Sequence, residues 1–219
     1  MISFSQDKDI LKYEPVLFSE LYFPGQVLVS GTGASVSGTS LIKSGEDFQA
    51  AGTKAGQVIY LRSGDGNLDG CFEIVEVKSA TELTVSVLRA YGDDEIVGPL
   101  PASDVSYRIC TFEPQGREVM FELTQYFGIG PGDGSSEYSA DDILDVDVLR
   151  SVSVFAVLSC IYATLASGKS DGNGFWEKSF YYKKLFEKAR ERCKVDIDAG
   201  GDGVSDVRRI CSSGKLLRD

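Results

Sequence analysis

The chain has 219 residues, of which 42% are hydrophobic and 25% are charged, enough for one or two globular domains that need no disulfide or metal for stability. It contains no histidine, which excludes His-based catalytic pairs and His-containing zinc sites. The net charge of −11 argues against DNA binding by the whole surface, because such binding neutralises phosphates with basic side chains.

Residues 1–25 predict an N-terminal helical lead. Asp7 and Asp9 suit the first turn of a helix, and Pro15 interrupts the middle of the segment. Residues 1–7 lack the basic and apolar regions of a signal peptide, so we expect none. The five cysteines are an odd number at wide spacing, which favours free thiols in a reducing compartment.

Residues 26–113 predict a β-rich domain. Apolar and polar residues alternate in several short segments, which indicates strands at 26–30, 57–62, 71–77, 82–88 and 105–111. The Gly, Ser and Thr residues at 31–39 predict a loop. Five or six short strands at this spacing favour a small antiparallel barrel or sandwich.

Residues 114–194 predict a helical domain, and residues 195–219 predict an extended polar tail. Helices are expected at 116–127, from Ser139 to about residue 166 with a break near Asp145, and at 175–194. The uncharged stretch 151–168 is at the short limit for a membrane span, and we expect it to be buried in protein. The fold class is therefore α+β.

Charge is unevenly distributed in the C-terminal half. Residues 133–147 hold six acids and no base, whereas residues 169–194 hold eight bases and four acids. Such opposite charges suit contact between neighbouring subunits, and two separate solvated faces are the alternative.

No motif predicts catalysis or a cofactor. Residues 33–40 have the glycine spacing of a phosphate loop, but Thr39 stands where the lysine should be. Asp198, Asp202 and Asp206 have the spacing of a calcium loop, but Arg209 stands where a bidentate Glu belongs. We therefore expect a polar turn there, no metal, no cofactor and no enzymatic activity.

The C-terminal 80 residues resemble the head–tail connector (portal adaptor) proteins of tailed bacteriophages. The resemblance is carried by an acidic-capped helix with DVLR at 147–150, the apolar run VFAVLS at 154–159, the aromatic helix FWEKSFYYKKLFE at 175–187, and a Gly-Asp-Gly segment before a polar tail. It implies a structural virion protein, located in the neck and in the host cytoplasm during assembly.

The implied assembly is a ring, usually of twelve subunits, beneath the portal. Such a ring links the capsid to the tail and lines the DNA exit channel, so its partners are copies of itself, the portal protein, and tail or neck proteins. DNA passes through without specific binding, and no membrane is involved. The alternative is a virion or surface β-barrel module that binds protein or glycan through aromatics such as Tyr60, Tyr91 and Tyr107.

The resemblance also assigns roles to particular side chains. The predicted subunit interface is apolar and comprises Leu149, Val152, Phe155, Tyr162, Trp176, Phe180, Tyr182 and Phe186. The predicted lumen-facing acids are Asp141, Asp142, Asp145 and Asp147. The predicted portal-docking tail carries Arg208, Arg209, Lys215, Leu216, Leu217 and Arg218. The apolar helix 143–165 must be covered, either by a neighbouring subunit or by the β-domain.

Overall fold

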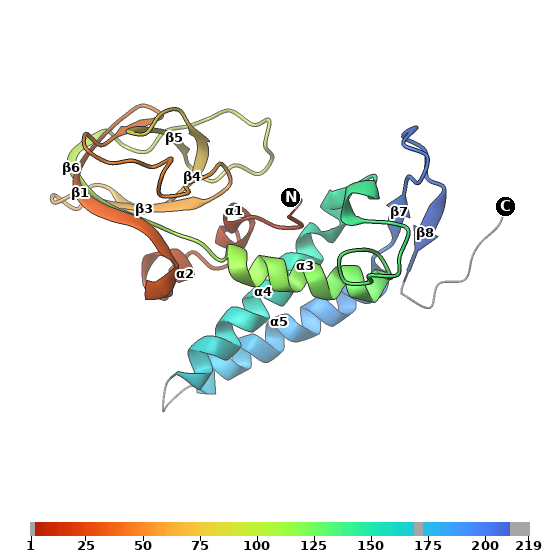
Figure 1. The fold of residues 1–219 in the computed structure, drawn as a ribbon. Helices are drawn as coiled ribbons and strands as arrows, with labels where there is room; N and C mark the ends of the chain where they lie inside the picture. Colours follow the sequence, from red (N-terminus) through yellow and green to blue (C-terminus); the bar gives the residue numbers. More distant parts are fainter. Residues whose placement is uncertain (1–2, 169–172, 211–219) are drawn as a thin grey trace. The chain divides into compact units, whose positions relative to one another are not determined.

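The computed structural model describes residues 3–168 and 173–210 (Figure 1). The chain has two compact units, and the fold is α+β as expected. The barrel unit is formed by Gln6–Phe112, and the helical unit by the residues from Glu113 onward together with residues 3–5. This division corrects the predicted boundaries: residues 1–25 are not a separate lead, and Glu113 starts the helical unit instead of ending the β-domain.

The barrel unit contains a closed antiparallel barrel of six strands, which resolves the choice between barrel and sandwich. The strands follow one another around the barrel in the order β1-β2-β5-β4-β3-β6, and β6 pairs with both β3 and β1 to close it. Their bounds are β1 Val27–Ser37, β2 Ser40–Ile42, β3 Val58–Arg62, β4 Asp69–Val77, β5 Glu82–Ser86 and β6 Ala102–Cys110.

The predicted loop at 31–39 is wrong, because β1 continues to Ser37 and turns back into β2. Ala34 and Val36 are buried in the barrel core. A Cβ atom on Gly31 would lie 2.6 Å from the hydroxyl oxygen of Tyr107. The glycine that suggested a loop is therefore a small residue that leaves room for an aromatic side chain of the barrel.

Side chains from all six strands and from the segments between them fill the barrel interior. The core comprises Ala34, Val36, Leu41, Phe48, Ile59, Leu61, Leu68, Ile74, Leu83, Val85, Val105, Tyr107 and Ile109. Burial of such apolar side chains away from water provides most of the favourable free energy of folding.

The N-terminal segment forms two short helices, α1 (Asp7–Leu11) and α2 (Val16–Ser19), followed by the 3₁₀ turn η1 (Pro24–Gln26). Both helices contact β3. The rings of Phe18 and Phe23 pack edge-on against Phe112, and the Asp7 carboxylate accepts a hydrogen bond of 2.8 Å from the Phe112 backbone N–H. The start of this segment is thereby bonded to the end of the barrel unit.

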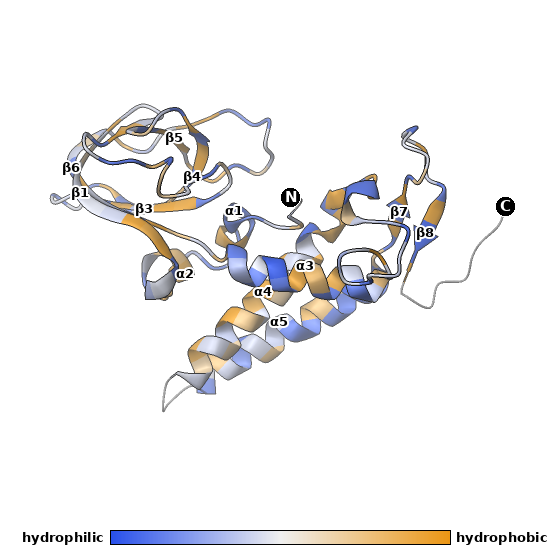
Figure 2. Ribbon diagram, in the orientation of Figure 1, coloured by the Kyte–Doolittle hydropathy of each residue, from blue (hydrophilic) through white to orange (hydrophobic). Residues whose placement is uncertain are grey.

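In the helical unit, α3 (Glu113–Phe127) and α5 (Asn173–Arg192) pack against α4 (Arg150–Ser167). The predicted helix from Ser139 is interrupted, because η2 (Ala140–Asp142) and η3 (Val146–Leu149) precede α4. Asp145 caps η3 through the backbone N–H of Asp147, at the predicted break. Hydrophobic residues predominate along α4, whereas hydrophobic and hydrophilic residues alternate along α5 (Figure 2).

Aromatic rings and hydroxyls join α4 to α5. The ring of Tyr182 stacks on those of Tyr162 and Phe155, at centroid distances of 6.0 and 6.4 Å. Ser159 and Ser179 each donate a hydrogen bond to the other's backbone carbonyl, at 3.1 and 3.0 Å. The apolar helix predicted at 143–165 thus receives cover from α3 and α5 of its own chain.

One stretch of the described residues, Val146–Ser167, is long and apolar enough to cross a membrane by length and composition. Half of its most apolar window is buried inside the chain. A core helix of a soluble protein passes the same test, so this stretch is only weak evidence for a membrane span.

Strands β7 (Val195–Ile197) and β8 (Val207–Arg209) form an antiparallel hairpin that follows α5 (Figure 1). Val195 and Ile197 are fully buried, and Ile197 bridges to Ile143. Residues 195–210 therefore fold onto the helical unit, which corrects the prediction of an extended tail. The part of the predicted portal-docking tail at 215–218 lies outside the described residues.

Candidate interaction surface

The outward side of α5 exposes three aromatic side chains. Trp176, Phe180 and Tyr181 are 42%, 56% and 58% exposed, although aromatic rings of this size are usually covered. Trp176 and Phe180 are one helical turn apart, and their rings stack at a centroid distance of 6.0 Å. The inward side of α5 carries Tyr182, which is used in packing against α4. The exposed aromatics thus lie on a second side of the helix, which residues 3–168 and 173–210 leave uncovered.

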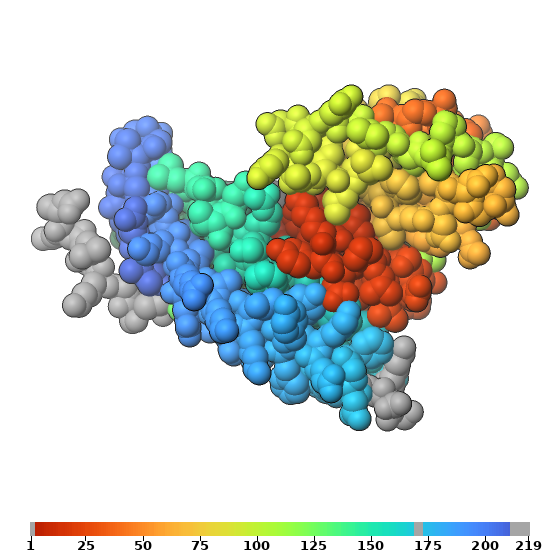
Figure 3. Space-filling model, turned by 180° about the vertical axis from the view of Figure 1, so that it is seen from behind, coloured from red at the N-terminus to blue at the C-terminus, as the bar shows by residue number. Residues whose placement is uncertain are grey.

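Charged side chains of both signs lie on the same side of α5, because Glu177, Glu187 and Glu191 are exposed there among three lysines. Lys183, Lys184 and Lys188 are exposed, and none of them has an acidic side chain within ion-pair distance among residues 3–168 and 173–210. In the space-filling view, α5 lies open along the surface (Figure 3). We call this side of the helix the α5 outer face, comprising Trp176, Phe180, Tyr181, Lys183, Lys184 and Lys188 together with Glu177, Glu187 and Glu191.

The structure places most of the predicted interface residues inside the chain. Leu149, Val152 and Tyr162 are at most 2% exposed, and Tyr182 and Phe186 are 6% and 7% exposed, so they are interior residues. Helix packing within one chain needs the same apolar spacing as packing between chains, which is why the sequence pattern did not separate the two uses.

The three remaining predicted interface residues are aromatic. Phe155 is half-buried and stacks on Tyr182, whereas Trp176 and Phe180 remain available on the α5 outer face. Tyr181, which the sequence analysis missed, joins them. Its position one residue before the buried Tyr182 was the available signal, because adjacent helical residues point about 100° apart.

A second exposed surface lies just before α4, at residues 141–148, and we call it the acidic segment. Asp141, Asp145 and Asp147 are exposed, and the neighbouring Leu144 and Val148 are 41% and 39% exposed. This segment therefore combines negative charge with apolar area.

The predicted lumen-facing acids differ in their surroundings. Asp142 is half-buried and accepts a 2.7 Å hydrogen bond from the Ser139 backbone N–H, so it serves as a cap. Asp147 lies 3.6 Å from Arg150, and Asp141 is exposed in the first turn of η2. Three of the four acids can therefore face a partner, and Asp142 is committed to the local fold.

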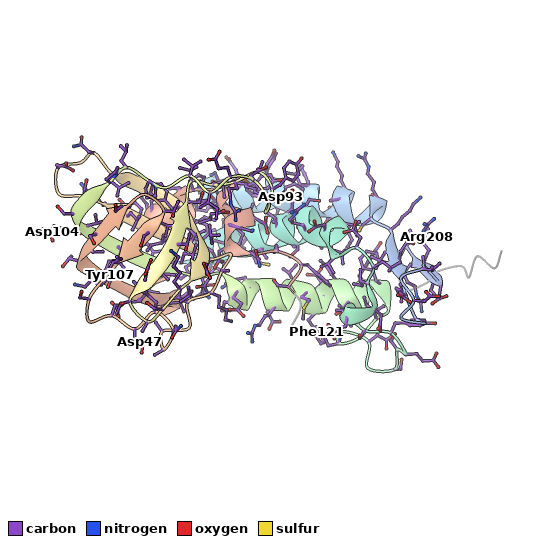
Figure 4. The ribbon with its side chains drawn as sticks, turned by 90° about the horizontal axis from the view of Figure 1, so that it is seen from above. Asp47, Asp93, Asp104, Tyr107, Phe121 and Arg208 are labelled. Atoms are coloured by element: carbon purple, nitrogen blue, oxygen red, sulfur yellow. The ribbon has the colours of Figure 1, made fainter. Side chains whose placement is uncertain are left out.

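The arginines of the β7–β8 hairpin have partners in the helical unit. Arg208, labelled in Figure 4, donates hydrogen bonds of 2.6 and 3.1 Å to Asp196, and this contact lowers the pKa of the Asp196 carboxyl. The Arg209 guanidinium lies 5.8 Å from the ring centroid of Tyr138. The two arginines predicted to dock on a portal therefore also stabilise the hairpin and its surroundings.

The turn between β7 and β8 uses its aspartates to bind backbone amides. Asp198 accepts hydrogen bonds from the amides of Gly201, Asp202 and Gly203, which lower the pKa of its carboxyl. Asp206 accepts from two further amides. These bonds favour the polar-turn alternative, and no group of three or more metal-binding side chains occurs in the described ranges.

The barrel unit has an open groove of about 520 Å³ lined by residues of η1, β1 and β6 and by Tyr22. The Arg108 guanidinium lies 3.7 Å from the ring centroid of Tyr22 and 5.1 Å from that of Tyr60. It also donates to the backbone carbonyls of Phe18 and Ser19. These contacts hold the arginine in place beside the groove.

The three candidate glycan-binding tyrosines have different environments. Tyr107 is 3% exposed inside the barrel (Figure 4), whereas Tyr91 is 69% exposed on the segment after β5. Tyr60 donates a 2.7 Å hydrogen bond to Asp69, and this bond raises the pKa of the Tyr60 hydroxyl. Two tyrosines line the groove: Tyr107, which was predicted, and Tyr22, which was not.

Comparison of the chain with known proteins found no matching family model, no similar curated protein and no similar solved structure.

Proposed function

We propose that the protein is a structural, non-enzymatic subunit of a ring that joins the head of a tailed bacteriophage to its tail. In this function it assembles beneath the portal in the virion neck, having been made in the host cytoplasm. Copies of the chain, the portal, and tail or neck proteins are its partners. The ring is expected to hold twelve subunits, and DNA passes through it without specific binding.

The observation that carries this proposal is the α5 outer face. Trp176, Phe180 and Tyr181 are exposed on a helix whose opposite side is already packed against α4. Exposed aromatic side chains are enriched at protein–protein contact surfaces. The net charge of −11 suits a channel wall that must release DNA, because negative charge repels phosphates.

Light scattering on the purified chain, alone and with a candidate portal, tests this function. We expect a particle near twelve times the chain mass of 23.7 kDa, or co-migration with the portal ring. Replacing Trp176 and Phe180 by alanine should abolish that particle. Tyr91→Ala is the matched control, because Tyr91 is also an exposed aromatic but lies in the barrel unit. A monomer that binds neither portal nor neck proteins would contradict the proposal.

A second candidate function is suggested by the barrel groove. Its open volume and the ring of Tyr22 beside Arg108 suit a glycan or an extended protein segment, since sugars stack on aromatic faces and arginine donates several hydrogen bonds. In that case the chain is a virion or surface binding module. Tyr22→Ala would then abolish binding to a glycan array or to virion proteins, whereas Trp176→Ala would leave it intact.

A further inference from the structure

We infer that the α5 outer face of one copy pairs antiparallel with the same face of a second copy, so that the free chain is a two-fold dimer. The contact is centred between Phe180 and Tyr181. This inference goes beyond the proposed function, because it concerns the chain before any ring forms. The dimer covers the exposed rings, and it has to open before the same face can serve in a ring.

Two adjacent aromatic side chains form the middle of the contact. Phe180 and Tyr181 are 56% and 58% exposed, and residues 3–168 and 173–210 leave them uncovered. Neighbouring helical residues point about 100° apart, so the two rings lie on either side of a line that runs along the face. Two copies that meet here therefore remove the rings of both from water, which favours association.

Opposite charges flank this aromatic pair at equal distances along the helix. Glu177 lies three residues before Phe180, and Lys184 lies three residues after Tyr181. Both are exposed, and their separation is close to two helical turns, so they point to the same side. Neither forms an ion pair among residues 3–168 and 173–210. Each copy thus offers one acid and one base to a neighbour.

A two-fold axis midway between Phe180 and Tyr181 brings these charges together. It places Glu177 of each copy opposite Lys184 of the other, so the contact contains the same ion pair twice. A parallel pair of helices would instead place Glu177 against Glu177 and Lys184 against Lys184. Like charges opposed at an interface cost free energy, so the charges favour the antiparallel arrangement.

The rest of the α5 outer face is compatible with this register. The two helices overlap over residues 173–188, a length of about 24 Å. Trp176 and Lys183 lie on the same edge of the face, so each indole ring comes near a lysine of the other copy, which is a favourable contact. The three lysines and three glutamates of the face balance, so a copy does not meet a surface of its own net charge.

Charge reversals in the full chain test the pairing by sedimentation equilibrium. We expect the wild type to sediment at twice the chain mass of 23.7 kDa. Glu177→Lys and Lys184→Glu each oppose like charges at two positions of the contact, so each should associate about tenfold more weakly than the wild type. The double variant exchanges both charges and should recover wild-type association. Lysine and glutamate both suit a helix, so none of these changes should unfold α5.

A 1:1 mixture of the two single variants provides an independent check. One variant carries lysine at both positions and the other carries glutamate at both, so only unlike chains oppose unlike charges. With one variant labelled with ¹⁵N, native mass spectrometry should show heterodimers in excess over both homodimers.

Arg117→Glu and Glu118→Lys are the matched controls. They make the same charge changes at exposed positions of α3, which belongs to the same unit as α5. Both should associate like the wild type. Circular dichroism confirms that each variant is folded.

Crosslinking of the unmodified protein gives a readout that does not depend on variant folding. A carbodiimide joins a carboxylate to a lysine amine in contact with it. A mixture of ¹⁴N- and ¹⁵N-labelled chains should yield hybrid peptides that link Glu177 to Lys184.

Three results would overturn the inference: a wild type that stays monomeric at high concentration, a double variant as weakly associated as the single ones, or the absence of hybrid Glu177–Lys184 peptides from the associated protein. The portal experiment decides the ring function separately. A chain that is monomeric alone but joins a portal ring contradicts only the dimer. A dimer that binds neither portal nor neck proteins contradicts only the ring function.

Discussion

Removing Arg89 should destabilise the barrel unit more than removing an arginine from an exposed ion pair. Arg89 binds Glu73 in an ion pair in which the side chains are 10% and 1% exposed. Arg89→Leu leaves the Glu73 carboxylate buried without its counter-charge, and losing one partner of a buried pair costs about 3–5 kcal/mol of unfolding free energy. Arg62→Leu is the control, because the Arg62–Asp69 pair is largely exposed. Its loss should be below about 1 kcal/mol.

A double variant separates the buried charge from the lost packing. Replacing both Glu73 and Arg89 by leucine removes the charge as well as its partner, so most of the stability should return. Urea unfolding followed by far-UV circular dichroism measures the four forms. The fluorescence of Trp176, the only tryptophan, reports on the helical unit and serves as an internal reference. A loss of less than about 1 kcal/mol in Arg89→Leu, or a double variant as unstable as the single one, would show that the unpaired Glu73 charge does not cause the destabilisation.

Three further predictions follow from local contacts. Gly31→Ala should lower the unfolding free energy by about 1–3 kcal/mol, since its Cβ would overlap Tyr107, while Gly25→Ala, which meets no atom within 4 Å, should change it little in the same urea assay. Burial raises the pKa of the Cys193 thiol to about 11, so as the pH rises the unfolded chain loses that proton before the folded chain does. The unfolding free energy should therefore fall between about pH 9 and 11. An equal fall in Cys193→Ala would contradict this. Asp198→Ala should speed hydrogen exchange at the amides of residues 201–203, which its carboxylate now binds, and unchanged rates would show that those bonds do not protect the turn.

Alternation of apolar and polar residues predicted the later strands of the barrel well. The segment 57–62 corresponds to β3, and 82–88 to β5 with two fewer residues. The same approach missed most of β1 and all of β2, because residues 31–39 are mostly small and polar. Strand formation there depends on pairing with β6 and on space for Tyr107, which are contacts distant in sequence.

The interaction surface was predicted only in part. Helical spacing identified an apolar stripe on the last helix, but it could not tell that Tyr182 faces α4 while Phe180 faces outward. The direction of each side chain depends on where α4 lies, and a single helix does not encode that. The break near Asp145 was predictable, because an aspartate that caps a turn leaves a local signal.

The barrel unit is an insertion within the helical unit, and this fixes an order of events during synthesis. Residues 3–5 belong to the helical unit, and the Ser5 hydroxyl lies 2.8 Å from that of Ser153, 148 positions later. A ribosome completes the barrel, whose two ends are joined through Asp7 and Phe112, before Ser153 exists. Ser5 is thus made before the barrel, but it can meet Ser153 only after the whole barrel has been synthesised.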